Sequence, residues 1–161
     1  MATSEESFSL VDAAKLDKVT LQLLQEAESA LKYAYAPYSS FQVATAILLE
    51  DKTIITGTNQ ENAAYPSGMC AERVALFTVA SQYPGKKIKK MLVLARASGA
   101  ARSTPATSCG SCRQVMLEFE HRQQEPFDVI MQTKPDTWVV ARSAESLLPF
   151  SFTPENLQVR K

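Results

Sequence analysis

Three cysteines and one glutamate have the residue types and the spacing for chemistry on a metal ion. Cys109 and Cys112 form a C-x-x-C pair, and Cys70 lies two residues before Glu72. At that spacing both sulfurs of the pair face one side of a first helical turn, so one ion can contact both. Cys70 begins a second expected helix, and the positive ends of helix dipoles favour the thiolates that metals bind. A redox pair and half of a structural zinc knot remain alternatives for the C-x-x-C pair alone.

The number of available ligands favours a catalytic zinc ion over a structural one. Structural zinc sites fill all four positions with protein ligands, whereas catalytic sites keep one position for water. The only histidine, His121, lies nine residues beyond Cys112, roughly 13 Å along the expected helix. We therefore predict one Zn²⁺ per chain, held by Cys70, Cys109 and Cys112, with the fourth position open to water.

Glu72 is the predicted catalytic residue. A carboxylate beside a zinc site can accept a proton from water and deliver it to a substrate. Zinc lowers the pKa of a bound water towards ~7, which makes hydroxide available at neutral pH. Three thiolates weaken the ion as a Lewis acid, and we expect Arg73 and Arg113, which each follow a ligand segment, to offset this by hydrogen bonds to the sulfurs.

Composition and charge narrow the class of protein. The 161 residues are 45% hydrophobic, and seventeen basic residues balance seventeen acidic ones. Zero net charge argues against polynucleotide binding. We interpret a local basic run as a solvated loop; it consists of Lys86, Lys87, Lys89 and Lys90. No segment resembles a secretion signal or a membrane span, so we expect a cytoplasmic protein without membrane contact. Three cysteines in such a chain do not form a disulfide framework.

The elements that must position these residues alternate between helix and strand. Apolar periodicity predicts helices over residues 16–35, 71–83 and 112–121, and a helical turn over 145–148. Strands are expected over residues 41–49, 53–58, 91–95, 127–132 and 138–141. This order predicts an α/β fold with one mixed sheet and helices on both faces. We expect a single domain over residues 1–161, with residues 1–15 as a loosely ordered N-terminal extension.

Five motifs together resemble the small, three-cysteine, homotetrameric cytidine deaminases. They are C-A-E-R at 70–73, C-G-S-C-R-Q at 109–114, A-P-Y-S-S-F at 36–41, N-Q-E-N-A-A-Y at 59–65 and L-L-P-F-S-F at 147–152. The zinc motif and its deaminase chemistry are a known signature. The resemblance implies a three-layer α/β/α cytidine deaminase-like fold with a mixed five-stranded sheet, and a homotetramer.

The resemblance also implies which residues bind the nucleoside. Asn59 and Glu61 would hydrogen-bond the ribose 3′-hydroxyl, and Phe41 would pack against the pyrimidine. The Ala63 backbone and Tyr65 would line the site, and Phe152 would reach from one subunit to cover the base in another. Without the resemblance, Phe41 would fit a plain core aromatic equally well, and Tyr65 and Phe152 would indicate a core or an interface.

Two departures from the family pattern bear on the site. Ser108 stands where the family usually has a proline, so the fixed φ of proline before Cys109 is lost. Ala44-Thr45-Ala46 stands where the family tends to have Gly-Ala-Ala. Neither change touches the zinc ligands or Glu72, and we interpret both as adjustments of the site.

The predicted reaction is hydrolytic deamination at C4 of cytidine and deoxycytidine, which gives uridine and deoxyuridine in pyrimidine salvage. One alternative is a deaminase of a modified cytosine nucleoside such as blasticidin S. Another is a protein with purely structural zinc, which would require His121 at the metal or Glu72 turned away from it. The third alternative, polynucleotide editing, lacks a basic, aromatic-rich face.

Overall fold

A six-stranded mixed sheet forms the centre of the computed structural model, which describes residues 7–157. The strand order is β1-β6-β5-β4-β2-β3, with β4 and β5 parallel and the other pairs antiparallel. The strands are β1 (Phe8–Asp12), β2 (Phe41–Leu49), β3 (Ile54–Thr58), β4 (Ile88–Ala97), β5 (Asp128–Lys134) and β6 (Thr137–Ala141). The α/β fold with a mixed sheet is therefore confirmed.

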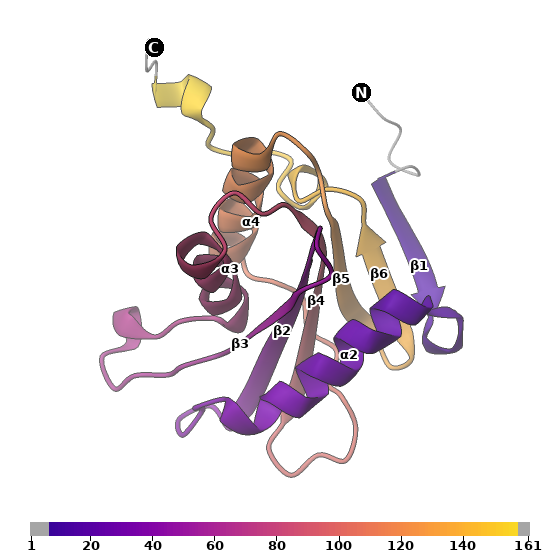
Figure 1. The fold of residues 1–161 in the computed structure, drawn as a ribbon. Helices are drawn as coiled ribbons and strands as arrows, with labels where there is room; N and C mark the ends of the chain where they lie inside the picture. Colours follow the sequence, from indigo (N-terminus) through magenta and orange to yellow (C-terminus); the bar gives the residue numbers. More distant parts are fainter. Residues whose placement is uncertain (1–6, 158–161) are drawn as a thin grey trace.

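Three α-helices complete a three-layer α/β/α arrangement (Figure 1). α2 (Lys18–Ala30) covers one face of the sheet, and α3 (Ala71–Gln82) and α4 (Gly110–Gln123) cover the other. Side chains of β4 alternate between the two apolar cores: Leu92 packs on the α2 side and Val93 on the α3 side. This double burial explains the continuous apolar run that predicted a central strand.

The strand count and the N-terminal segment differ from expectation. The sheet has six strands rather than five, because Phe8–Asp12 pairs antiparallel with β6 from Phe8↔Ala141 to Asp12↔Thr137. Residues 8–12 are thus an ordered edge strand, and the prediction of a loosely ordered extension is wrong for them, while residues 1–6 lie outside the described part. The backbone groups of β6 supply the reason, since an unpaired edge gains hydrogen bonds from an added strand.

The first predicted helix, over residues 16–35, is shorter in the structure. Asp17 caps α2 by accepting a hydrogen bond from the Thr20 N–H at 2.8 Å, and the α-helix ends at Ala30. A 3₁₀ turn, η2 (Leu31–Tyr33), follows it. Further 3₁₀ turns are η1 (Ala13–Lys15), η3 (Tyr65–Ser67), η4 (Glu145–Leu147) and η5 (Pro154–Leu157). Within residues 7–157, none of the helices has the length and apolarity needed to cross a membrane.

α3 lies unusually close to β3 at Gly57. A Cβ built on Gly57 would lie 2.5 Å from the Ala75 nitrogen and 2.7 Å from the Ala71 oxygen. Only glycine permits this approach of strand to helix. The contact fixes the height of α3 above the sheet, and α3 begins directly after Cys70.

Candidate active site

The three cysteines converge at the N-termini of α3 and α4. Cys70 and Cys109 are the N-cap residues of the two helices, and Cys112 lies in the first turn of α4. The Sγ atoms of Cys70 and Cys109 are 4.0 Å apart, those of Cys109 and Cys112 are 3.5 Å apart, and all three lie within 4.8 Å. A tetrahedral zinc ion with ~2.3 Å bonds requires sulfurs about 3.8 Å apart. The donor set therefore fits zinc.

Hydrogen bonds already favour a thiolate in this cluster. A hydrogen bond from the Cys112 thiol, aided by Arg73, lowers the pKa of Cys70 to about 5, although burial opposes the shift. The Arg73 guanidinium donates to the Cys70 Sγ at 3.6 Å. The same hydrogen bond to Cys70, together with burial, raises the pKa of Cys112. Metal binding requires the Cys112 thiol to lose this proton.

The hydrogen-bond partners of Arg113 differ from those expected. Its Nε donates to the Ser108 carbonyl at 2.9 Å, and its Nη1 donates to the Leu147 carbonyl at 3.2 Å. The expectation that Arg113 bonds a sulfur is therefore wrong in this structure. Because the guanidinium donates to both carbonyls, Arg113 links the segment before Cys109 to the 3₁₀ turn η4.

Glu72 lines a cavity of about 640 Å³ together with Cys70 and Cys109. Only 4% of Glu72 is exposed, and burial raises the pKa of its carboxyl group. The cavity is also lined by Phe41, Val43, Asn59, Glu61 and Tyr65. A buried carboxyl group with a raised pKa beside the cysteine cluster is suited to accept and return a proton.

Asn59 and Glu61 lie at the cavity wall, and both already hold the backbone. The Asn59 Oδ1 accepts from the Val43 N–H at 2.8 Å, and its Nδ2 donates to the Phe41 carbonyl at 2.9 Å. These bonds fix the amide against β2. It keeps one further lone pair and one further N–H for a ligand.

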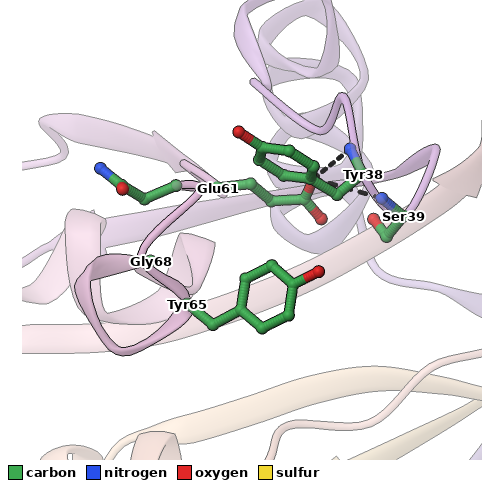
Figure 2. A pocket seen from close by; sticks show the side chains of 6 residues that line it. Tyr38, Ser39, Glu61, Tyr65 and Gly68 are labelled. Atoms are coloured by element: carbon green, nitrogen blue, oxygen red, sulfur yellow. Dashed lines mark hydrogen bonds between the residues drawn. The ribbon is translucent and has the colours of Figure 1, made fainter.

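The Glu61 Oε2 accepts from the backbone N–H groups of Tyr38 and Ser39, at 2.9 and 3.3 Å (Figure 2). Hydrogen bonds from Ser39 and Tyr38 lower the pKa of Glu61, so it is charged at neutral pH. Tyr65 faces the same hollow of about 410 Å³ and meets Tyr38 edge-on, with ring centroids 6.2 Å apart (Figure 2). This hollow shares Ser39, Glu61, Tyr65 and Gly68 with the larger cavity.

The structure does not bring every expected site residue into the cavity. Ala63 is exposed and lies outside the lining. Phe152 is 58% exposed, and its carbonyl accepts from the Gln114 side chain at 2.7 Å. Val93 and Thr107 do line the cavity and were missed by the sequence analysis. The position of Thr107 two residues before Cys109 is the signal that could have found it.

His121 lies away from the cysteine cluster. It lines a separate hollow with Glu118 and Glu145, near the C-terminal end of α4. Within residues 7–157, the group of potential ligands consists of the three cysteines. The alternative of a structural site completed by His121 is therefore contradicted.

A three-layer α/β/α fold with three convergent cysteines and a buried carboxyl group fits the class of zinc-dependent hydrolases. The family described as "Cytidine and deoxycytidylate deaminase zinc-binding region" matches residues 17–124. The cytidine deaminase of Sporosarcina psychrophila is 37% identical over 136 residues, which cover 84% of this chain and 93% of that protein. The chain belongs to the cytidine and deoxycytidylate deaminase family.

Further relatives agree with this assignment. The probable cytidine deaminase of Dictyostelium discoideum is 36% identical, with 83% of this chain and 84% of that protein covered. The crystal structure of cytidine deaminase from Burkholderia pseudomallei has a TM-score of 0.66 and 37% identity, and covers 82% of this chain and 98% of that one. The expectation of zinc is confirmed by the zinc-binding family match together with the cysteine cluster.

Proposed function

We propose that this chain hydrolyses the 4-amino group of cytidine and deoxycytidine and so produces uridine, deoxyuridine and ammonia. The observation that carries this proposal is that the buried Glu72 lines one cavity with Cys70 and Cys109, whose sulfurs converge with that of Cys112. Relatives named cytidine deaminases at 36–37% identity support the choice of substrate.

Each residue has a defined role in the proposed reaction. Zinc, when bound by the three thiolates, supplies the Lewis acidity that makes water nucleophilic at neutral pH. Glu72 takes a proton from the water that attacks C4 and delivers it to N3 of the ring. Glu72 then takes the proton of the new C4 hydroxyl and transfers it to the amino group, and the C4–N bond breaks as the C4 carbonyl forms, with release of ammonia. Arg73 stabilises the Cys70 thiolate through its hydrogen bond.

The substrate is held by residues at the mouth of the cavity. Glu61 and Asn59 offer acceptors and a donor for the sugar hydroxyls, and Phe41 forms an apolar wall for the base. Ala63 and Tyr65 belong to the segment that follows Glu61 in the sequence, and Tyr65 is 77% exposed. A homotetramer would cover such exposed aromatics, including Phe152 from a neighbouring subunit, and we include it in the proposal.

The lysine cluster gives no support to a polynucleotide substrate. Lys86 pairs with Asp51, Lys87 and Lys89 both pair with Glu125, and Lys90 pairs with two aspartates. These carboxylates neutralise the cluster that a phosphate backbone would need. We propose a small nucleoside substrate, a role in pyrimidine salvage and a cytoplasmic location, in keeping with three free cysteines.

The proposal is tested by product analysis with zinc-loaded protein and five substrates supplied separately. These are cytidine, deoxycytidine, deoxycytidylate, blasticidin S and a cytosine-containing single-stranded oligonucleotide. We expect the two nucleosides to be converted and the oligonucleotide to remain intact. Conversion of blasticidin S alone, or of deoxycytidylate alone, would replace the proposed substrate by that compound. Sedimentation of the same sample measures the oligomeric state, with a tetramer expected.

A further inference from the structure

A hollow of about 410 Å³ continues the cavity beyond Glu61 and Tyr65 (Figure 2). Its lining includes neither Glu72 nor a cysteine, so the hollow extends the part of the cavity that is away from the cysteine cluster. In a cytosine nucleoside the sugar is attached at N1, across the ring from C4. A nucleoside whose C4 lies at Glu72 therefore directs its sugar away from the cysteines. The hollow offers the space for substituents on that sugar.

The Glu61 carboxylate is fixed where the hollow joins the cavity. Its Oε2 accepts from the backbone N–H groups of Tyr38 and Ser39, at 2.9 and 3.3 Å. Hydrogen bonds from Ser39 and Tyr38 also lower the pKa of Glu61. A carboxylate held in this way is charged at neutral pH, and it cannot rotate away from an incoming ligand without breaking both backbone hydrogen bonds.

Within residues 7–157, no cationic side chain lines the hollow beside Glu61. The other residues of its lining are uncharged: Tyr38, Ser39, Asn62, Tyr65 and Gly68. The cation that lines the larger cavity is Arg73, and its guanidinium donates to the Cys70 Sγ at 3.6 Å. A phosphate on the sugar carries close to two negative charges near neutral pH. It would therefore meet a fixed carboxylate without a counter-charge.

We propose that Glu61 is a specificity-determining residue: its carboxylate admits neutral and cationic substituents on the sugar and repels a phosphate. This inference rests on the proposed function, in which Glu61 faces the sugar of the nucleoside. The matched family covers deoxycytidylate as well as cytidine deaminases, and deoxycytidylate differs from deoxycytidine by its 5′-phosphate. An unpaired charge directed against the wrong ligand provides this kind of selectivity.

Two variants that change the charge in opposite directions test the proposal on zinc-loaded protein. The measured quantity is the phosphate ratio, kcat/KM for deoxycytidylate divided by kcat/KM for deoxycytidine, in which a general loss of activity cancels. Glu61→Gln should raise this ratio about tenfold, the size of the repulsion between one carboxylate and a dianion about 6 Å away in water. Asn62→Asp should lower the ratio, because it adds a carboxylate and keeps the acceptor for the Ala64 N–H at 2.8 Å.

Two controls separate the local charge from net charge and from bulk. Glu26→Gln removes an exposed carboxylate from α2, on the other face of the sheet, and should leave the phosphate ratio unchanged. A 5′-sulfamate of deoxycytidine is neutral and about as large as the phosphate, and the 5′-amino analogue is cationic. Wild type should convert both more readily than deoxycytidylate. Added salt should raise the phosphate ratio of wild type, because it screens the repulsion.

The possible outcomes separate this inference from the proposed function. A wild type that converts deoxycytidylate as efficiently as deoxycytidine overturns the role of Glu61. The same holds for a phosphate ratio in Glu61→Gln within about twofold of wild type, for an equal change in Glu26→Gln, and for a sulfamate converted as poorly as the phosphate. A zinc-loaded wild type that converts neither cytidine nor deoxycytidine overturns the proposed function instead.

Discussion

Replacing Gly57 by alanine should displace α3 and thereby lower the affinity of the three cysteines for zinc. The added Cβ would lie 2.5 Å from the Ala75 nitrogen and 2.7 Å from the Ala71 oxygen. Both atoms belong to the backbone, so no side-chain rotation relieves the clash. An ordinary contact begins at 3.4 Å, so β3 and α3 must separate by about 0.9 Å. Overpacking of this kind costs ~1–3 kcal/mol, and we expect about 2 kcal/mol less free energy of unfolding.

The displacement should also reach the site, because Cys70 caps α3 whereas Cys109 and Cys112 belong to α4. Functional groups must be held within about 0.5 Å, so zinc affinity should fall at least about tenfold. Urea unfolding and competition with a chelator measure the two effects. Gly110→Ala is the matched control, since a Cβ there meets no atom within 4 Å. Wild-type stability and zinc affinity in Gly57→Ala would refute the reasoning.

Three other predictions concern stability. Glu120→Ala should lower the free energy of unfolding by about 3 kcal/mol, because the carboxylate accepts hydrogen bonds from two buried backbone N–H groups; a loss below about 1 kcal/mol in urea unfolding contradicts this. Asp17→Ala should cost ~1 kcal/mol more than Asp17→Asn, since asparagine keeps the N-cap acceptor for the Thr20 N–H. Although burial opposes the shift, hydrogen bonds from Lys90 and Thr20 lower the pKa of Asp17 to about 2. The charge of Asp17 therefore stabilises the fold above about pH 4, and this contribution is lost as the pH falls towards 2, where the stabilities of wild type and Asp17→Asn should converge. Removal of zinc by a chelator should lower Tm and added zinc should restore it, because the ion joins two helices; an unchanged Tm would mean that the cluster adds nothing to stability.

The core of the fold could be predicted because each of its strands and helices shows a characteristic pattern of apolar residues within its own sequence. β2 covers Phe41–Leu49 as predicted, and α3 begins at Ala71 as predicted. β1 could not be predicted in this way. Its five residues alternate between exposed and half-buried, and their strand conformation depends on the edge of β6, about 130 residues away in sequence.

In the candidate site, too, some features could be predicted from local sequence and others depend on distant segments. Cys70, Cys109 and Cys112 gather because each lies at a helix start that the sequence marks. The direction of Arg113 depends instead on the carbonyl of Leu147, which arrives from a distant segment. Such long-range contacts have no local signature, and for this reason the expected bond to sulfur was wrong.

The loss of cytidine absorbance, measured for wild type beside Glu72→Ala with zinc content determined on both, tests the central claim most directly. Wild type should convert cytidine to uridine, and the variant should keep about one zinc per chain yet lose at least ~10²-fold in rate, as expected for a missing general acid–base group. A zinc-loaded Glu72→Ala protein that deaminates cytidine at the wild-type rate would contradict the account.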